Sequence, residues 1–210
     1  MRDKISGIIL AGGNNRRIKL DKAFLRFPIN GNDTITLIEI TLNKFRKLFQ
    51  EIIIVSNSPE KFRHLKIKTV PDIIQNKGSL GGIFTGLSEA SNERCFITAC
   101  DMPFLNPKLI KYMLDLESDY DVLIPKTKSG YEPMHAVYSK NCLPVIFDHL
   151  ESDRLKILNF FQKVEVQELS ENDLTKIDDN ILHSFFNINT KDEYASVLDQ
   201  EGRKQDFLTI

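Results

Sequence analysis

Short apolar runs alternate with longer stretches of helical period through the first half of the chain. Most of these runs are almost continuously apolar, and they have the length of strands. A strand without a polar face is typical of a sheet that is covered on both sides. The runs that predict buried strands are 5–10, 51–55, 67–70, 95–99 and 122–124.

The stretches between these runs repeat their apolar residues with a helical period. In 34–49 the apolar residues form one stripe, with Lys and Arg opposite, and 81–90 and 107–116 have a similar character. The third stretch begins with Asn106 as an N-cap and Pro107 in the first turn. Strands that alternate with helices predict an α/β fold with a doubly wound, mostly parallel sheet in three layers, α/β/α. In such sheets ligands bind at the carboxyl ends of the strands.

The second half of the chain is less regular. We expect strands at 131–138 and 164–169, helices at 142–150, 154–163 and 191–198, and a polar loop at 171–180. No repeat or linker divides the sequence, so we predict one domain over 1–199 and a C-terminal tail over 200–210.

Composition narrows the class of protein. The 210 residues are 41% hydrophobic and 27% charged, as in an ordinary soluble globular protein. The formal net charge of −1 provides no overall attraction to nucleic acid or to an anionic membrane. No membrane span or secretory signal is visible, and we expect reduced cysteines in a cytoplasmic protein. Cys95 and Cys100, at the two ends of one run, should face opposite sides of the sheet, which argues against a shared metal.

The first strand leads into a loop with unusual chemistry. From residue 8 to residue 22 the sequence is IILAGGNNRRIKLDK. Gly12 and Gly13 leave backbone amides uncovered and cations follow them, which is suited to a polyanion. The spacing fits neither the G-x-G-x-x-G dinucleotide loop nor the G-x-x-x-x-G-K-[ST] P-loop. The loop therefore predicts a phosphate site of another type.

This loop resembles the L-A-G-G-x-S-x-R-M-G-x-D-K signature of nucleotidyltransferases, in the form found in molybdenum cofactor guanylyltransferases. Three positions depart from that signature, at Asn15 (usually Ser), Ile18 (usually Met) and Lys19 (usually Gly). The resemblance implies a Rossmann-like nucleotidyltransferase fold whose first loop binds the nucleotide. The residues that match are Leu10, Ala11, Gly12, Gly13, Arg17, Asp21 and Lys22.

Lys22 is the candidate catalytic cation. A lysine taken alone is usually a solvated surface residue, but its place in the signature favours a phosphate contact. Its charge can neutralise a leaving pyrophosphate, and the guanidinium of Arg17 can do the same with a fork suited to phosphate oxygens. Arg16, Lys19 and Arg26 are expected to form a charged rim.

Asp101 is the candidate metal ligand. It ends an apolar strand and precedes Met102 and Pro103, which fixes its carboxylate at the sheet's carboxyl edge. The residue alone leaves a second role open, since an aspartate before a turn often caps backbone amides. In the resembled family a D-x-P at this point holds Mg²⁺ against the triphosphate, and Mg²⁺ needs only one or two carboxylates when phosphates and water complete its shell.

Asp72, Gly78 and Asn57 are candidate nucleotide contacts farther from the phosphates. Asp72 precedes the turn GSLGG at 78–82, where the family has G-P-L-x-G and this chain has Ser79 in place of proline. Carboxylate and backbone acceptors can read the N1–H and amino groups of guanine. Asn57 resembles a nucleotide-contacting asparagine of the family, although its Ser-Asn-Ser-Pro turn needs no ligand to explain it.

Two later segments indicate a second substrate. GYEPMHAVY at 130–138 resembles G-x-x-x-P-L-x-A-V-Y, and FFNINT at 185–190 matches F-x-N-I-N-T. Asn and Thr ahead of a helix are also ordinary capping residues. On the resemblance, the residues that bind molybdopterin are Pro133, Tyr138, Asn187, Asn189 and Thr190.

The resemblance implies an enzyme that transfers GMP from GTP to the molybdopterin cofactor, with Arg17, Lys22 and Asp101 as catalytic residues and Mg²⁺ as cofactor. Proteins that deliver the cofactor and receive the product are further partners to consider. The Ala-Gly-Gly form of the loop favours guanine, because cytidine enzymes more often have Ala-Ala-Gly. The four histidines show no ligand spacing, and no covalent nucleophile is expected, because the acceptor phosphate can attack directly.

Two kinds of alternative remain open. Within the same class, the chain is a cytidylyltransferase or a sugar-phosphate nucleotidyltransferase. From a different class, it is a non-catalytic GTP-binding module, which the departures from the signature would allow. Intact Lys22 and Asp101 favour catalysis over pure binding.

Overall fold

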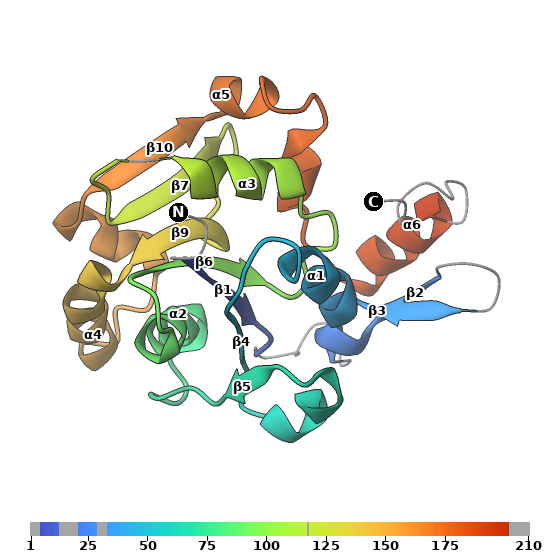
Figure 1. Ribbon diagram of the computed structural model, residues 1–210, viewed down its shortest axis with the longest axis horizontal. Helices are drawn as coiled ribbons and strands as arrows, with labels where there is room; N and C mark the ends of the chain where they lie inside the picture. Colours follow the sequence, from blue (N-terminus) through green and yellow to red (C-terminus); the bar gives the residue numbers. More distant parts are fainter. Residues whose placement is uncertain (1–4, 13–20, 29–32, 117, 202–210) are drawn as a thin grey trace.

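The centre of the protein is an eight-stranded, mostly parallel sheet (Figure 1). The computed structural model describes residues 5–12, 21–28, 33–116 and 118–201. The strand order is β10-β7-β9-β6-β1-β4-β5, with β8 paired to β7, and β8 and β9 run against the other strands. The strands are β1 (Ile5–Leu10), β4 (Ile52–Val55), β5 (Lys68–Val70), β6 (Arg94–Ala99), β7 (Val122–Thr127), β8 (Gly130–Tyr131), β9 (His135–Ser139) and β10 (Val166–Ser170).

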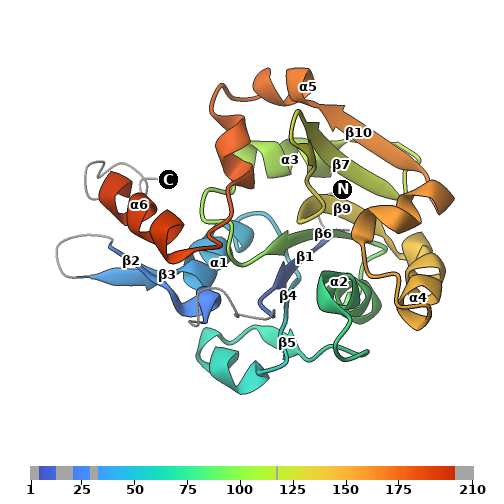
Figure 2. The same ribbon diagram turned by 180° about the vertical axis from the view of Figure 1, so that it is seen from behind.

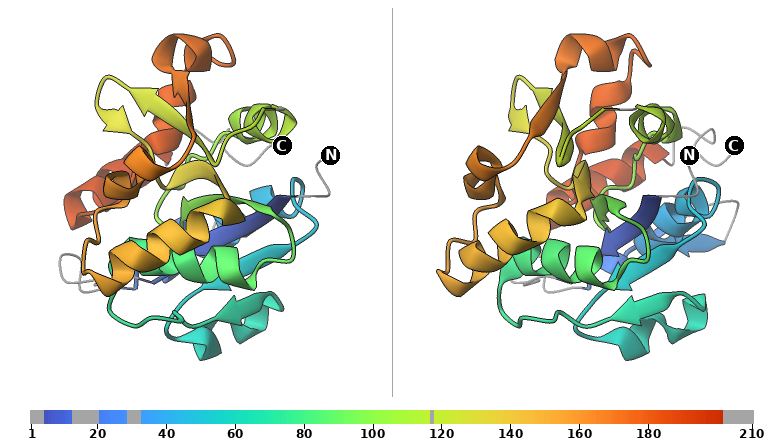
Figure 3. Two further views of the ribbon diagram at one scale, coloured as in Figure 1. Left: turned by 90° about the vertical axis from the view of Figure 1, so that its left-hand side faces the viewer. Right: turned by 60° about the vertical axis from the view of Figure 1, so that its left-hand side comes forward.

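Helices cover both faces of this sheet, as the side views show (Figure 3). α1 (Leu37–Phe45) and α3 (Pro107–Asp115) pack on one face, and α2 (Gly78–Glu89) and α4 (Leu143–Glu151) on the other. β1 is buried at all six positions, which explains its lack of a polar face. Cys95 belongs to one core and Cys100 to the other, so the predicted opposition of these side chains is confirmed.

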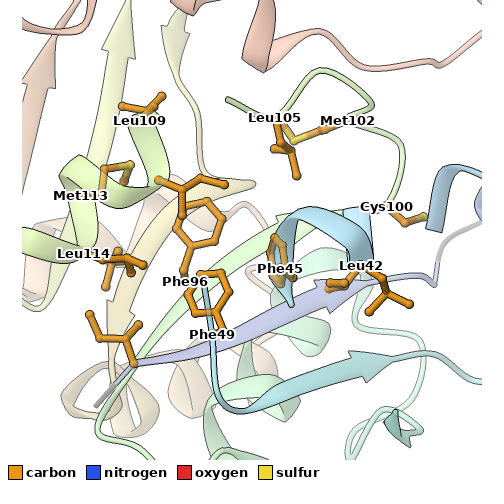
Figure 4. Packing of buried hydrophobic residues seen from close by; sticks show 14 of the residues in the cluster. Leu42, Phe45, Phe49, Phe96, Cys100, Met102, Leu105, Leu109, Met113 and Leu114 are labelled. Carbon is orange, nitrogen blue, oxygen red and sulfur yellow. The ribbon is translucent and has the colours of Figure 1, made fainter. Parts of the chain in front are cut away.

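Aromatic rings fill the core on the α1 side (Figure 4). The ring centroids of Phe45 and Phe49 are 4.7 Å apart, and each lies 5.9 Å from the ring of Phe96 on β6. Rings of this size bury about 150–250 Å² each and dominate core energetics. The cluster therefore fixes α1 over β1 and β6.

On the opposite face, α2 approaches the sheet very closely. A Cβ at Gly86 would lie 2.6 Å from Cγ2 of Ile8, and one at Gly82 would lie 3.2 Å from Leu10. Only glycine allows a helix backbone to pack at this distance from β1. The close approach sets the first turn of α2 beside the carboxyl end of β1.

A small outer layer lies beside the carboxyl ends of the central strands. It consists of β2 (Arg26–Pro28), paired antiparallel with β3 (Thr34–Thr36), and α6 (Lys191–Glu201), which lie together in both Figure 1 and Figure 2. The ring of Phe27 meets that of Tyr194 edge to face, with centroids 5.5 Å apart. This layer brings a segment near the N-terminus against one near the C-terminus.

The predicted α/β fold and the five early strands are confirmed, whereas several boundaries are wrong. The predicted helix 34–49 starts as β3, because Thr36 and Glu39 form a capping box that begins α1 only at Leu37. The predicted strand 131–138 is divided by a turn in which the His135 amide bonds to the Glu132 carbonyl.

Three further expectations also need correction. The predicted helix 154–163 is a 3₁₀ segment, Ile157–Lys163, and Asp153 before it has a φ of +52°. The predicted loop 171–180 opens with α5 (Glu171–Thr175), which Ser170 caps through the Asp173 amide. The final helix α6 reaches Glu201, beyond the predicted end at residue 198 and into the predicted tail. Shorter 3₁₀ turns complete the chain at Lys22–Phe24, Pro59–Leu65, Lys140–Cys142 and Ile181–Phe185.

Candidate active site

The candidate site lies along the carboxyl ends of four adjacent strands. β6, β1, β4 and β5 are neighbours in this order, and they lead into Asp101, Gly12, Asn57 and Asp72. Neighbouring strands are about 4.8 Å apart, so this row spans roughly 15 Å. The topology thus brings four of the residues predicted from sequence to one edge of the sheet.

Lys22 contacts residues from two distant parts of the chain at this edge of the sheet, Asp101 and Asn189. Its Nζ lies 2.7 Å from Oδ2 of Asp101 and 2.9 Å from Oδ1 of Asn189. Burial of the neighbouring Ala23 anchors the 3₁₀ turn that carries the lysine. The lysine and aspartate side chains are only 20% and 16% exposed, so Lys22 is not a freely solvated surface residue.

The Asp101 carboxylate is held by its backbone and not by capping. The Cys100 amide bonds to the Leu10 carbonyl, and the Ile188 amide to the Asp101 carbonyl, each at 3.0 Å. Among the described residues, no backbone amide donates to the carboxylate and Lys22 is the one side chain that does. The geometry therefore favours a charged ligand role over the capping role.

The residues at this position suit a magnesium ion that is shared with phosphates. Among the described residues, Oδ1 of Asp101 has no hydrogen-bonding partner, and no cluster of three or more His, Cys, Asp or Glu side chains could enclose a metal. Mg²⁺ is usually bound through one or two carboxylates with substrate phosphates and water. The donor set would therefore fit Mg²⁺ brought by a nucleotide, with the Asp101 carboxylate available to it.

Gly12 lies beside Asp101 at the end of β1. The Ala11 amide before it bonds to the Val55 carbonyl, continuing the pairing with β4, whereas Gly12 is exposed and no described residue accepts a bond from its amide. Leu10 is buried in the core and positions this turn without exposing its side chain. Gly13 and Arg17, both predicted to contact phosphate, lie outside the described residues.

Gly78 is the first residue of α2, after the loop that follows β5. It has a φ of +59°, a left-handed conformation that favours glycine, and a Cβ there would meet nothing within 4 Å. The requirement is therefore conformational and not a matter of space.

Asn57 and Asp72 form a compact polar cluster at the end of the row. Asn57 accepts a bond from the Asp72 amide at 2.9 Å and donates one to Oδ2 of the same residue at 2.8 Å. Burial raises the pKa of the Asp72 carboxyl above its usual range, and the Asn57 bond opposes that shift. No described cation pairs with Asp72.

Asn189 reaches this edge from the C-terminal segment, and Glu193 holds its backbone in place. The Asn189 and Thr190 amides donate to Oε2 of Glu193 at 2.6 and 2.8 Å, and the Glu193 amide donates to the Thr190 hydroxyl at 3.1 Å. The bond from the Asn189 backbone is the main cause that holds the pKa of Glu193 below its usual value. Asn187 donates to the Phe185 carbonyl at 3.0 Å, so it shapes the same segment.

The other predicted molybdopterin-binding residues are Pro133, in the turn between β8 and β9, and Tyr138, within β9. Tyr138 is fully buried and donates its hydroxyl to the Pro133 carbonyl at 2.8 Å, so its ring supports the turn and offers no surface to a ligand. Glu132 in this turn is half-buried, no described residue bonds to its carboxyl, and burial raises its pKa to about 7.

Three polar residues of this site escaped sequence analysis: Gln75, Glu132 and Glu193. A signal existed for the last, because Thr190 and Glu193 have the T-x-x-E spacing of a capping box. Glu132 is the polar residue inside an otherwise strand-like run. Gln75 had no signal, since its partners come from two different strand ends.

The cysteines do not serve as nucleophiles. All three are buried free thiols, and burial raises the pKa of Cys95 and of Cys142 to about 12. The reactive thiolate is therefore scarce at neutral pH.

No helix of the described residues has the length and apolar character needed to cross a membrane.

Comparison with known proteins places this geometry in a family. A MobA-like NTP transferase domain is recognised over residues 7–166. A probable molybdenum cofactor guanylyltransferase of Natranaerobius thermophilus is 42% identical over 98% of this chain and 100% of its own. The molybdenum cofactor guanylyltransferase of Desulfosudis oleivorans is 38% identical over 91% of this chain and 93% of its own.

Solved structures agree with these sequence relatives. Molybdopterin-guanine dinucleotide biosynthesis protein A from Archaeoglobus fulgidus superposes with a TM-score of 0.81 at 27% identity, covering 95% of this chain and 100% of the other. A 4-diphosphocytidyl-2C-methyl-D-erythritol synthase from Anaerococcus prevotii reaches 0.64 at 17% identity over 96% and 97% of the two chains, which shows a shared fold only. The chain belongs to the molybdenum cofactor guanylyltransferase family and is a nucleotidyltransferase.

Proposed function

We propose that the protein transfers GMP from Mg·GTP to the terminal phosphate of molybdopterin that carries molybdenum. The products are the guanine dinucleotide form of the cofactor and pyrophosphate. The observation that best supports this proposal is the Lys22 ammonium, which touches both Asp101 and Asn189. One cation thereby joins the proposed nucleotide side of the site to the proposed molybdopterin side.

The reaction requires alignment more than acid–base chemistry. An acceptor phosphate oxygen attacks the α-phosphorus of GTP, and the bond from that phosphorus to the bridging oxygen of the β-phosphate breaks, releasing pyrophosphate. Bound Mg²⁺ would neutralise charge on the phosphates. The Gly12 amide, with Gly13 and Arg17, would hold the triphosphate, and Asp101 would hold the metal.

Lys22 must exchange partners during this reaction. In the free protein it neutralises the Asp101 carboxylate, which would need no such cation if it held a metal. The ammonium is then free to move to phosphate oxygens, where its charge matters most as pyrophosphate departs. Asn189 loses its Lys22 contact at the same time and becomes available to the acceptor.

The acceptor side is proposed to comprise Asn187, Asn189 and Thr190 together with the turn at Pro133. Glu193 holds the first group in shape, and Tyr138 holds the turn. We take residues 1–199 as one transferase unit that works in the cytoplasm, where free buried thiols such as these persist.

A nucleotide panel tests the proposal directly. The protein is incubated with Mg²⁺, molybdopterin carrying molybdenum, and GTP, CTP or ATP in turn, and released pyrophosphate and the incorporated base are measured. GTP should support turnover and guanine should appear in the product. Turnover with CTP would indicate a cytidylyltransferase, and GTP binding without any pyrophosphate release would indicate a binding module.

A further inference from the structure

Two hydrogen-bond acceptors beside Asn57 have no donor in the described parts of the chain. Gln75 reaches back into the Asn57–Asp72 cluster, where its Nε2 donates to the Asp72 carbonyl at 2.8 Å and to Oδ1 of Asn57 at 3.2 Å. No described residue donates to Oε1 of Gln75 or to Oδ1 of Asp72. The loop therefore presents a pair of free oxygens.

The orientation of these amides follows from a single backbone donor. The Asp72 N–H can only donate, so the Asn57 atom that meets it at 2.9 Å must be its oxygen. With that oxygen fixed, Gln75 must present its nitrogen to the same atom, and its own oxygen is left unused. The same fixing aims the Asn57 nitrogen at Oδ2 of Asp72, which leaves Oδ1 unused.

Two acceptors in one short loop match one nucleobase. Guanine carries the donors N1–H and the exocyclic 2-amino group side by side on its Watson–Crick edge. Cytosine presents two acceptors and one donor there, adenine one of each, and uracil a single donor between two acceptors. A pair of acceptor oxygens is therefore matched by two donors only in guanine, and it repels the acceptors of cytosine.

The position of the loop suits a base. β5 lies two strands from β1, and hence about 10 Å from the phosphate loop at Gly12. Ile73, between the two acceptor residues, is 52% exposed and is one of the large apolar side chains left open to solvent. Its amide is fixed to Oγ1 of Thr85 on α2, so the loop that carries it is anchored. An aliphatic surface beside polar acceptors is the usual composition of a ligand site.

We propose that Gln75 is a specificity-determining residue, whose Oε1 accepts the 2-amino group of guanine while Oδ1 of Asp72 accepts N1–H. This inference rests on the proposed function, because it assigns the base contacts of the same nucleotide. It assigns a different donor of guanine to each of Gln75 and Asp72.

The test is a double-mutant cycle between the protein and its ligand. Affinities for Mg·GTP and Mg·ITP are measured by calorimetry for the wild-type protein, Gln75→Met and Asp72→Asn. Inosine keeps N1–H but lacks the 2-amino group, so the two nucleotides differ at the one contact assigned to Gln75. Methionine keeps the length of the side chain and removes its acceptor.

Gln75→Met should weaken GTP binding roughly fivefold, the value of one neutral hydrogen bond, and leave ITP binding unchanged. Asp72→Asn should weaken both nucleotides by the same factor, because both carry N1–H. If the ratio of GTP affinity to ITP affinity in Gln75→Met equals that of the wild type, whether both affinities are unchanged or both fall by the same factor, the role of Gln75 is overturned. Wild-type protein that binds neither nucleotide would instead contradict the proposed function, so the two failures are distinguishable.

Discussion

Two carboxylates at the same edge of the sheet have opposite surroundings. Asp101, after β6, is paired with an ammonium at 2.7 Å, whereas Asp72, after β5, is held by a neutral amide at 2.8 Å. The β1 and β4 strands separate them. Among the described residues, Asp101 thus has a cation beside it and Asp72 has none paired with it.

The difference indicates what each carboxylate is suited to bind. A carboxylate whose cation is a side chain can exchange that cation for a metal without a large change in local charge. A carboxylate fixed by dipoles, with a pKa raised by burial, is better suited to neutral N–H donors. One edge of the sheet can therefore treat the phosphates and the base of a nucleotide by different chemistry.

The largest effect is expected from Asp101→Asn. The change keeps the size of the side chain and removes the charge that would hold Mg²⁺, so transfer should fall by about a thousandfold, the upper range for one electrostatic contact. Folding should persist, since no described backbone amide depends on the carboxylate. Initial rates of pyrophosphate release at saturating GTP, with circular dichroism for the fold, make the measurement.

A matched control for this variant is Glu89→Gln, which removes a carboxylate charge paired with Lys68 at 2.9 Å at the other end of β5. It should leave turnover unchanged. Full activity of Asp101→Asn at ordinary Mg²⁺ would contradict the metal role.

Lys22→Met should lower kcat about a hundredfold, roughly 3 kcal/mol, and change GTP affinity much less. The reason is that the Lys22 charge is needed most when pyrophosphate leaves, whereas in the free protein it is already engaged by Asp101. Steady-state kinetics with GTP and molybdopterin varied separately would show the split. Lys68→Met, the same change at the opposite edge, serves as control, and near-normal turnover in Lys22→Met would make Lys22 merely structural.

Asp72→Asn should weaken GTP binding about tenfold, close to the value of a hydrogen bond to a charged group. Asparagine can still accept the Asn57 bond, so the cluster stays intact while the free oxygen becomes a donor that guanine N1–H repels. Turnover at saturating GTP should stay close to that of the wild type. A loss of kcat as large as that in Asp101→Asn would remove the distinction between the two carboxylates.

Sequence predicted the Asp101 end of this edge better than the Asp72 end. The strand before Asp101 was visible as an apolar run because the middle of β6 is buried, whereas β5, before Asp72, is a short strand with no buried position. Lys22 and Asp101 came from a signature, and the structure brings them together across 79 residues of sequence. The bond from Lys22 to Asn189 and the bonds from Gln75 to the Asn57–Asp72 cluster depend on strand order, which no local pattern encodes.

Where a predicted boundary or contact is wrong, a local hydrogen bond or the packing of the side chain gives the reason. Thr36 and Glu39 cap each other and delay α1, although the buried Ile35 before them extends the apolar stripe. Tyr138 was a candidate ligand contact by its motif, yet the sheet register places it opposite Cys95 in the core. A motif therefore marks a position of importance without telling whether the side chain meets a ligand or supports one that does.

The smallest effect concerns stability, and it has a definite sign. Because the folded-state pKa of Asp72 is raised, the folded protein binds more protons than the unfolded chain between the usual aspartate pKa and the raised one. The charged carboxylate therefore costs stability once the pH exceeds the raised pKa, and this cost is absent below the usual pKa near 3.8. Asp72→Asn should raise Tm at pH 7.5 by about 1 °C, the scale of a small change in a domain of this size, and the gain should disappear at pH 3.5.

Asp178→Asn is the opposite control, because the Asn180 amide and Lys108 hold its pKa below the usual value, so its substitution should lower Tm at pH 7.5. Thermal unfolding of the three proteins at both pH values makes the comparison, and a fall in Tm for Asp72→Asn at pH 7.5 would show that the carboxylate stabilises the fold and is not held there at a cost for a ligand.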